Sequence, residues 1–581
     1  MAESPKLSRK KSIKEPVADV DGILEKIKPF GRYQLLLTLI YSFTYFQGII
    51  NNLFMGYGGI IPKWTCSDPE VYNGTSISPN SVTDNCIIYK ACPAENLTFV
   101  SDFYSIANQW SLVCDKDYFI SLITTIQMVG LLTGALMIGP VSDMFGRKWV
   151  FLVLLILEYA LGALSALAPS ATSFAMFRFF IGWTIGAENV VGWVYVAEVT
   201  TNRYHLLLRV GTAVFLPMWN QVLIAYLTKH WKWYSIVGNL EGVPVFPILI
   251  FFAYESPRWL VQKGRIKEAR RILEQMARIN QASHLLPENL NLESMIPKKR
   301  DGQKQPQIWD LFRTRRLAIY TLVCSSTWFA VSMVYYGMYF NIGNLPTNVY
   351  VNGLVVAGVL MLVIPLAAYD AYNPKMNRKY MMVIIFLITA VCNVAIALFQ
   401  TVLPQGAVSD GLLTMASVVG LLCTEAVFDT AYVYSIELFP TLLRSNAGGL
   451  CSVSARAGGA IAPQLLYAGK IWTPLPYVVF GGFCLVGALV DALFLPNTKN
   501  LHAPETIEQT NRLGQQQESG TESSNYGSVD DSKTAGGEHK GHVNPNIHWI
   551  TKDEGASSRG DMGYEDVECP KRDSDWSVSK Y

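Results

Sequence analysis

The sequence carries little charge for its length. Charged residues make up only 16% of the 581 positions, while half of the residues are hydrophobic. A soluble protein of this length usually divides into several domains and carries more charge. Here the apolar residues come in blocks of roughly 20, long enough to cross a bilayer as helices. The scarcity of charge therefore argues against an ordinary soluble, multidomain protein.

Motifs for catalysis and for energy transduction are also missing. The chain has only seven histidines, and the sequence contains no Walker phosphate loop, metal-ligand cluster or strand-to-helix serine elbow. We therefore expect no enzyme activity, no metal, no cofactor and no nucleic-acid partner. The N-terminus is too polar and basic for a signal peptide, so the first apolar run would act as the insertion signal.

Twelve apolar segments are candidate membrane spans, and they fall into two groups of six. The segments are about 33–55, 118–141, 149–168, 172–197, 206–229, 233–254, 317–340, 349–369, 380–401, 411–436, 445–468 and 475–495. We predict an all-α membrane protein with twelve transmembrane helices in two six-helix halves, 33–254 and 317–496. The remaining segments are the N-terminus 1–32, a central loop 255–316 and a tail 497–581 that we expect to be disordered.

Basic loops predict the orientation of the chain. The segment 255–316 carries fourteen Lys and Arg residues, and the N-terminus opens "SPKLSRKKSIK". Cytoplasmic loops are enriched in such residues. With an even number of spans, both termini and the central loop then face the cytoplasm. The expected setting is multi-pass insertion in the plasma membrane, with the lipid bilayer itself as a partner.

The loop between the first two spans, about 56–117, then faces outside, and its residues agree with that. It holds four cysteines and two N-x-[ST] sequons, which suit an oxidising, glycosylated compartment. Four cysteines allow three disulfide connectivities, and the sequence does not choose among them. The cysteines are Cys66, Cys86, Cys92 and Cys114, and the sequons are at Asn73 and Asn96.

A compact turn, "GPVSDMFGRK" at 139–148, joins the second and third spans. Gly139 is expected to let helices pack closely, and Gly146 to permit a tight turn. Asp143 can pair with Arg147, an interaction that one conformation can make and another can break. The alternative is a generic basic loop with no gating role.

This turn resembles the signature of the major facilitator superfamily. Three further stretches sharpen the resemblance: "WSLVCD" at 110–115, "ESPRWL" at 255–260 and "ELFPTLLR" at 437–444. Together with the cysteine-bearing loop, the set resembles the organic cation, anion and carnitine transporter family, solute carrier family 22, over roughly 20–495. The resemblance implies the major facilitator fold and transport of a small organic ion by alternating access.

The resemblance also implies that charged residues at the cytoplasmic helix ends form an inner gate. The fourth span ends with a glutamate followed by an arginine, and the tenth span repeats that order. The alternative is that these are surface charges whose side chains snorkel to the interface. A second copy of the turn keeps Arg378 but has Asn377 where glycine is expected. The remaining gate candidates are Glu198, Arg203, Glu255, Arg258, Glu437 and Arg444.

Ionisable residues deep within spans cost about 2.5–3.5 kcal/mol each on insertion scales, so they usually face a cavity or a partner. The resemblance implies that spans one, four, seven and ten line a central cavity, with span eleven beside them. We therefore expect Glu188, Glu425 and Asp429 to line the cavity, and Glu158 and Glu241 to be structural. Glu425 and Asp429 are four residues apart and share one helix face.

Arg456 in "LCSVSARAGGAIAPQLL" is the cationic candidate. It could be a structural counter-ion of Glu425 and Asp429, it could bind a substrate carboxylate bidentately, or it could lie at a wet cavity rim. The resemblance adds that arginine before the paired glycines is typical of the family's anion and carnitine carriers. Against a purely anion-selective carrier stand Glu188, Glu425 and Asp429, which would make the cavity net negative. A zwitterion reconciles the two, because its carboxylate would meet Arg456 and its ammonium group the acids or an aromatic face.

Aromatic and amide side chains complete the predicted binding site. Tyr335 and Tyr336 on the seventh span offer cation–π contacts to an ammonium group, although packing is the commoner role of such tyrosines. Gln47 and Gln221 are weaker candidates for hydrogen bonding to substrate.

The sequence leaves three alternatives to a carrier of zwitterions or organic cations. They are an organic anion carrier of the same family, a sugar-porter-like carrier, and a membrane protein without transport activity. A coupling ion or exchange substrate is left open.

Overall fold

The structure is a computed structural model that describes most of the chain between Val20 and Thr510. The described residues are 20–28, 30–72, 81–200, 215–286, 292–295, 307–345, 348–365, 377–404, 406–440, 443–498, 504 and 507–510. Asn73 and Arg203 lie outside these residues, as does the predicted disordered tail, apart from positions 497, 498, 504 and 507–510.

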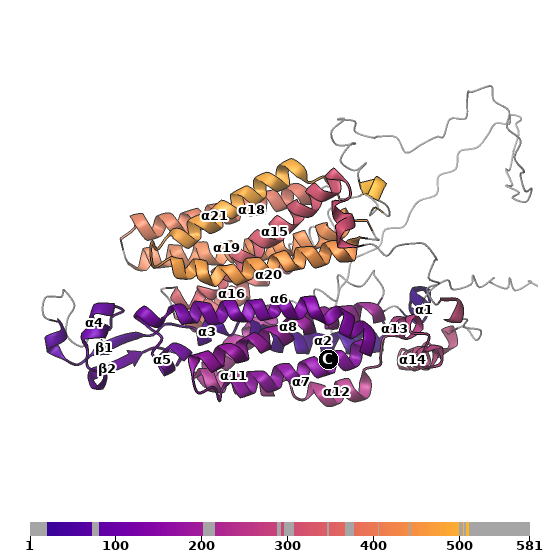
Figure 1. The fold of residues 1–581 in the computed structure, drawn as a ribbon, viewed down its shortest axis with the longest axis horizontal. Helices are drawn as coiled ribbons and strands as arrows, with labels where there is room; N and C mark the ends of the chain where they lie inside the picture. Colours follow the sequence, from indigo (N-terminus) through magenta and orange to yellow (C-terminus); the bar gives the residue numbers. More distant parts are fainter. Residues whose placement is uncertain are drawn as a thin grey trace, which may run out of the picture. The chain divides into compact units, whose positions relative to one another are not determined.

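Helices dominate the first half of the chain (Figure 1). They are α2 (Arg32–Asn52), α3 (Met55–Gly58), α6 (Tyr118–Phe145), α7 (Arg147–Ser165), α8 (Ala171–Val199), α10 (Phe215–Thr228), α11 (Trp231–Leu240) and α12 (Val245–Phe252). The sixth expected span is broken between α11 and α12, where Glu241, Gly242 and Pro244 interrupt the apolar sequence. The break puts a carboxylate in the middle of a predicted span.

The second half is also built of helices (Figure 1). They are α15 (Arg315–Phe340), α16 (Val349–Leu360), α18 (Arg378–Val402), α19 (Ala407–Leu438), α20 (Arg444–Ala468) and α21 (Leu475–Phe494). One apolar core belongs to the first half and another to the second, while a third cluster joins Ile49, Leu53 and Met218 of the first half to the second. Within the second half, α15 packs along both α19 and α20.

Seven helical segments of the described chain are long and apolar enough to cross a membrane. They are Cys114–Phe145, Arg147–Ser165, Trp231–Phe252, Arg315–Phe340, Arg378–Val402, Ala407–Ser435 and Leu475–Phe494. Three other helices, α2, α8 and α20, are 21, 29 and 25 residues long but contain polar side chains and glycines that lower their hydropathy. Such helices are buried against protein or cavity rather than lipid. The pattern is consistent with the predicted twelve-helix protein.

A small cysteine-bearing loop projects from one end of the helices, which we call the loop end (Figure 1). Its strands β1 (Lys63–Cys66) and β2 (Leu97–Val100) pair antiparallel, with Cys66 opposite Leu97. Short helices α4 (Cys86–Ala91) and α5 (Ile106–Trp110) accompany them. The structure selects one of the three possible disulfide pairings, Cys66–Cys92 and Cys86–Cys114.

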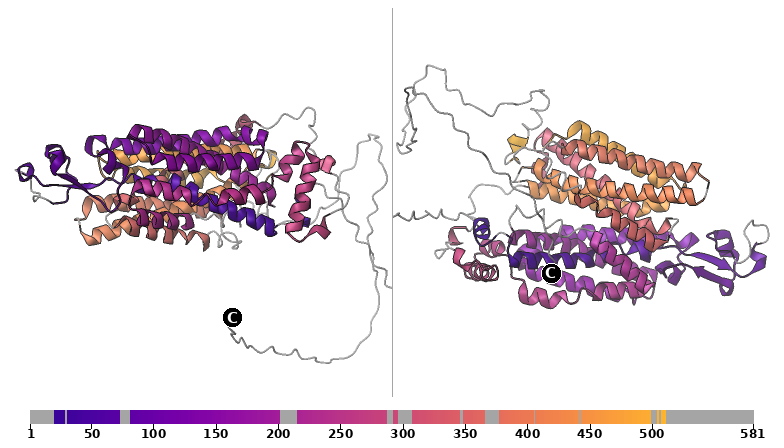
Figure 2. Two further views of the ribbon diagram at one scale, coloured as in Figure 1. Left: turned by 90° about the horizontal axis from the view of Figure 1, so that it is seen from below. Right: turned by 180° about the vertical axis from the view of Figure 1, so that it is seen from behind.

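Short amphipathic helices lie at the opposite end, which we call the linker end (Figure 2). They are α1 (Val20–Lys26), α13 (Pro257–Gln262) and α14 (Ile266–Ile279). Leu273 and Met276 of α14 are fully buried, while its arginines and glutamates face outward and pair along the helix. Asn280 anchors the group because its side chain accepts a hydrogen bond from the backbone of Tyr33 at 2.9 Å.

Glycines bring α6 and α8 into unusually close contact. A Cβ atom at Gly130 would lie 2.1 Å from the carbonyl oxygen of Phe179, and one at Gly134 would lie 2.0 Å from that of Trp183. The prediction that Gly139 serves this purpose is wrong, because no residue that the structure describes lies within 4 Å of its Cβ position. Close packing occurs five and nine residues earlier in α6, where backbone faces backbone.

The different surroundings of Gly134 and Gly139 predict different effects of a glycine-to-alanine substitution at the two positions. Gly134→Ala should destabilise the protein by about 1–3 kcal/mol, because the added methyl group forces α6 and α8 apart. Gly139→Ala is the matched control and should be neutral or slightly stabilising, since alanine favours helix over glycine. Thermal unfolding of the purified protein in detergent measures both. Equal stability of the two variants would contradict the packing described for Gly134.

Candidate functional site

An ion-pair network fixes the linker end of the first half around Arg147. Its guanidinium contacts Asp143 at 2.6 Å and Glu198 at 3.0 Å, and it also donates to the hydroxyl of Ser142 at 2.9 Å. The Arg147 side chain is only 8% exposed. The turn after α6 and the end of α8 are therefore tied together by one arginine. The sequence predicted the pair of Arg147 with Asp143 but not the pair with Glu198.

Glu255 completes this network from the segment after α12. Its carboxylate accepts hydrogen bonds from the backbone amides of Arg147 at 2.8 Å and Lys148 at 3.1 Å. Amides in the first turn of a helix have no partner within the helix, and the helix dipole at the start of α7 also favours a negative charge. Gly146 has a φ of +101°, and a Cβ there would lie 2.5 Å from a Glu255 oxygen. The predicted tight turn at Gly146 is confirmed, and Arg258 nearby donates to the carbonyl of Thr200 at 3.2 Å.

The second half contains a counterpart of this network. Arg378, the first residue of α18, forms an ion pair with Glu437 near the end of α19, and Glu437 also accepts from the Thr498 hydroxyl at 2.9 Å. The positions match those in the first half, where Arg147 is the first residue of α7 and Glu198 lies near the end of α8. The loss of glycine at Asn377 therefore does not abolish the ion pair, since Asn377 instead caps α18.

Arg444, predicted to act with Glu437, makes no ion pair within the described residues. Its Nε and Nη2 atoms are buried without hydrogen-bond partners there. The repeat of glutamate and arginine in the sequence thus identified the correct glutamate, but the structure pairs it with an arginine from another helix.

Arg456 lies halfway along α20, within the membrane by the predicted spans. Its Nη1 donates to the carbonyl of Ser452 at 3.2 Å and also to the Ser452 hydroxyl, one turn earlier in the same helix. Its Nε is buried without a partner, and it forms no ion pair with any described residue. In this structure, Arg456 is therefore not the counter-ion of Glu425 or Asp429.

Glu425 and Asp429 are partly buried and lie on one face of α19 with Tyr432. Tyr432 extends that face toward the first half, since its ring lies 6.4 Å from that of Trp193 on α8, at nearly a right angle. It also packs against Trp328 of α15. The two acids thus belong to the surface of the second half that faces the first half.

Tyr336 connects these charged groups. The charges of both Arg456 and Glu425 act on its hydroxyl group, and the position of Gly459 on α20 leaves room for its ring. The hydroxyl accepts a hydrogen bond from the amide of Asn52 on α2 at 3.2 Å. Tyr335 is also within electrostatic range of Glu425 and packs edge-on against Tyr336. Four predicted site residues, Glu425, Arg456, Tyr335 and Tyr336, are thereby brought together.

Glu188 belongs to a different group, in the interior of the first half. It is 1% exposed, and neither of its oxygens has a hydrogen-bond partner in the described part of the chain. The charge of Glu158 acts on it, and Glu158 in turn accepts from Asn51 at 3.0 Å. Glu188 therefore lies with a residue predicted to be structural, and not beside Arg456.

The two predicted glutamines also make contacts inside the protein. Gln47 donates to Glu241 at 2.8 Å, which ties α2 to the break between α11 and α12. Gln221 donates to the carbonyl of Leu53 at 3.2 Å and accepts from the Tyr339 hydroxyl at 2.9 Å. Gln221 therefore joins the two halves through α15.

Two buried charges were not singled out from the sequence. Arg178 of α8 is fully buried, with its guanidinium carbon 3.6 Å from the centroid of the Phe54 ring and Nη1 donating to the Asn51 carbonyl. Asp491 of α21 is fully buried and accepts from Thr327 at 2.7 Å. Both interrupt apolar runs, "FAMFRFFIGW" and "LVDALF", so the same argument that identified Arg456 applies to them.

Several contacts hold the two halves together at the loop end. Thr125 of α6 donates to the carbonyl of Ala460 on α20 at 3.1 Å, and Tyr350 of α16 donates to the carbonyl of Asp102 at 3.0 Å. Lys470, just after α20, pairs with Asp117 at the start of α6. Burial lowers the pKa of the Lys470 amine, and the charge of Asp115 raises it. At the linker end, by contrast, each ion-pair network described above lies within one half.

The chain matches the sugar (and other) transporter family over residues 70–509. An organic cation transporter protein of Drosophila melanogaster is 31% identical over 77% of this chain and 80% of its own length. Member 7 of solute carrier family 22 from Bos taurus is 33% identical over 71% of this chain and 74% of its own length. The chain belongs to solute carrier family 22. This solute carrier is thus a membrane transporter and not an enzyme.

Solved structures support the fold of this solute carrier. The inward-open form of the xylose transporter XylE from E. coli superposes with a TM-score of 0.54 at 15% identity, covering 83% of this chain and 98% of XylE. A D-xylose-proton symporter gives 0.53 at 14% identity. The predicted major facilitator fold is confirmed.

Proposed function

We propose that this solute carrier moves small organic ions across the plasma membrane by alternating access, with a zwitterion or organic cation as the favoured substrate. A carnitine- or betaine-like molecule, with one carboxylate and one ammonium group, fits the charges best. The observation that carries the proposal is Arg456, a partly buried arginine whose Nε is buried without a partner and which forms no ion pair with any described residue. It lies close to the ring of Tyr336 and within range of the same tyrosine as the charge of Glu425. Relatives named as organic cation transporters support the same substrate class.

Each charged group has a separate role in this proposal. Arg456 binds the substrate carboxylate, because a guanidinium can donate two parallel hydrogen bonds to it. Glu425 and Asp429 offset the positive charge of the ammonium group, and the faces of Tyr335 and Tyr336 contact it by cation–π interaction. Glu188 is given no substrate contact in this proposal, because it is buried beside Glu158 in the first half.

The loop end is proposed to face outside, and the linker end to face the cytoplasm. The two disulfides and the sequon at Asn96 support the first assignment, since disulfides persist in oxidising compartments. The basic linker supports the second. The linker-end networks of Arg147 and Arg378 are then proposed to belong to the inner gate, together with Glu255 and Arg258.

An organic anion is the second candidate substrate, and Arg456 itself favours it. Uptake of radiolabelled carnitine, tetraethylammonium and para-aminohippurate into cells expressing the chain separates the candidates. Saturable uptake of the first two supports the proposal, and preferential uptake of the anion supports the alternative. No saturable uptake of any organic ion would contradict both.

A further inference from the structure

A cavity of about 550 Å³ lies between the two halves at the loop end, away from Arg456. Tyr467 lines it and lies eleven residues after Arg456, so about 16 Å separates the two along α20. The cavity reaches the surface, since Asp84 and Thr473 in its wall are exposed. Its volume is in the range of ligand sites for small molecules.

The wall of this cavity is acidic and aromatic. Its charged residues are two acids, Asp84 and Asp117, and one base, Lys470. Three aromatic rings also line it, those of Phe340, Tyr467 and Tyr477. An acidic, aromatic wall attracts cations rather than anions.

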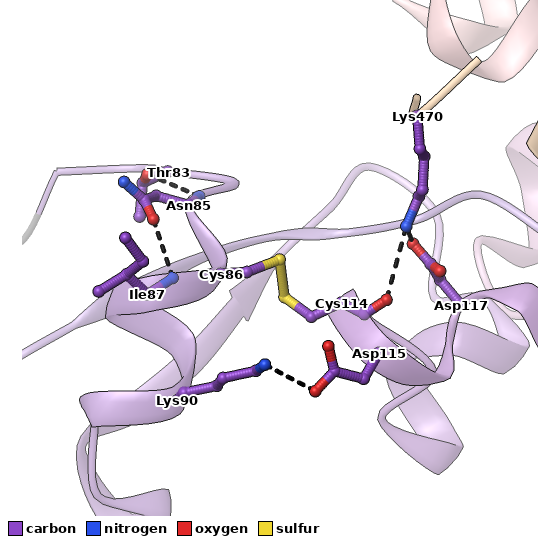
Figure 3. Close-up of a disulfide and its surroundings, with 9 residues drawn as sticks. All are labelled: Thr83, Asn85, Cys86, Ile87, Lys90, Cys114, Asp115, Asp117 and Lys470. Carbon is purple, nitrogen blue, oxygen red and sulfur yellow. Dashed lines mark hydrogen bonds and ion pairs between the residues drawn. A yellow bond between two sulfur atoms is a disulfide. The ribbon is translucent and has the colours of Figure 1, made fainter. Parts of the chain in front are cut away.

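Lys470 indicates what kind of group the cavity binds. Its ammonium group forms an ion pair with Asp117 (Figure 3). It lies 5.4 Å from the centroid of the Tyr467 ring. It also donates to the carbonyl of Cys114, which the disulfide to Cys86 ties to the loop. One carboxylate and one aromatic face are the recognition elements of an organic ammonium ion.

The carboxylate of Asp117 can accept a further hydrogen bond or ion pair. It is 4% exposed, and its Oδ1 atom has no hydrogen-bond partner in the part of the chain that the structure describes. Lys470 is bound less firmly, since its side chain is 46% exposed and flexible. A soluble cation can therefore take the place of the Lys470 ammonium without leaving the carboxylate unpaired.

We propose that this loop-end cavity is a second binding site, which takes a small organic ammonium ion from outside in place of the Lys470 ammonium group. Asp117 is the counter-ion of the bound cation, and Tyr467 provides the aromatic face. Because Asp117 and Lys470 belong to different halves, the incoming cation also releases one of the contacts that close the loop end. The inference rests on the proposed outward orientation of the loop end, but not on transport through the central site.

The test measures access to the cavity in intact cells. Thr473→Cys places a thiol in the wall, and a membrane-impermeant maleimide labels it, with the unsubstituted chain as background. Tetraethylammonium in the medium should slow labelling at least threefold and saturably, whereas butanesulfonate at equal concentration should not. Equal effects of the two ions, or no effect of either, would overturn the proposal.

Substitutions of Asp117 and Lys470 test the roles that the proposal gives to these two residues. Asp117→Asn should abolish protection, while Asp115→Asn, an exposed neighbour that pairs with Lys90 outside the cavity, should retain it. Lys470→Gln should lower the half-protecting concentration at least threefold, because the competing ammonium is gone. The half-protecting concentration measured in Lys470→Gln still tests the site if the Asp117→Asn variant does not reach the cell surface. Protection that survives in Asp117→Asn, or a half-protecting concentration unchanged in Lys470→Gln, would contradict the site.

The labelling test of the loop-end cavity can fail or succeed independently of the transport proposal. Asp429→Asn alters the proposed central site, and protection should persist in it even where uptake is lost. Loss of protection in Asp429→Asn would assign the cation to the central site and overturn the proposal. Protection without uptake of any organic ion would refute the transport proposal alone.

Discussion

Arg456→Ala is expected to lower kcat/KM for carboxylated substrates by about 10- to 150-fold. A hydrogen-bonded contact to a charged group is worth about 1.5–3 kcal/mol, and 1.4 kcal/mol corresponds to a factor of ten. Uptake of tetraethylammonium, which lacks a carboxylate, should be retained. Initial rates of uptake at several substrate concentrations, corrected for surface expression, provide the measurement.

Arg456→Lys is the matched variant for this prediction. Lysine keeps the charge but loses the planar fork, so uptake of carboxylated substrates should recover only in part. If carnitine uptake is normal in both variants, the proposed carboxylate contact is wrong. If tetraethylammonium uptake falls in parallel with carnitine uptake, Arg456 has a structural role instead.

Arg147→Ala is expected to reduce the free energy of unfolding by about 3–5 kcal/mol. Removing one partner of a buried ion pair leaves the other carboxylate without its counter-charge, and here Glu198, only 15% exposed, loses its arginine. Ser142 and the turn at Gly146 also lose their tie to α8. Uptake should fall at least tenfold. Thermal unfolding in detergent and uptake in cells measure the two effects.

Arg265→Ala serves as the control for Arg147→Ala. Arg265 pairs with Glu268 at 2.5 Å, but its side chain is 50% exposed, and exposed pairs contribute about 0–1 kcal/mol. A comparable loss of stability in the two variants would show that burial of Arg147 does not matter. Arg378→Ala should behave like Arg147→Ala because Arg378 holds Glu437 in the matching position of the second half.

The sequence predicted the helical architecture well because apolar runs have a strong and simple physical cause. The expected span 317–340 is α15, Arg315–Phe340, and 475–495 is α21, Leu475–Phe494. The turn at Gly146 and the pair of Asp143 with Arg147 were also predicted, since a local motif determines both. The break between α11 and α12 was not, because its polar residues are too few to interrupt the average hydropathy.

Contacts between distant residues could not be read from the sequence. The choice of Gly139 failed because a glycine in a motif does not reveal which helix faces it, and the structure places the close contacts at Gly130 and Gly134. Burial of Glu188 beside Glu158 depends on the rotation of α8 about its axis, which a helix without one distinct apolar face does not encode. The pair of Asp117 with Lys470 joins residues more than 350 positions apart, and no local pattern marks either one.

Exchange in proteoliposomes that contain only the purified chain tests the central claim most directly. Vesicles loaded with unlabelled carnitine should accumulate external radiolabelled carnitine saturably, and tetraethylammonium should compete for the carrier. Vesicles with the Arg456→Ala variant should accumulate carnitine at least tenfold more slowly while still taking up tetraethylammonium. Accumulation of neither ion above the level of protein-free vesicles would contradict the account of this chain as an organic ion carrier.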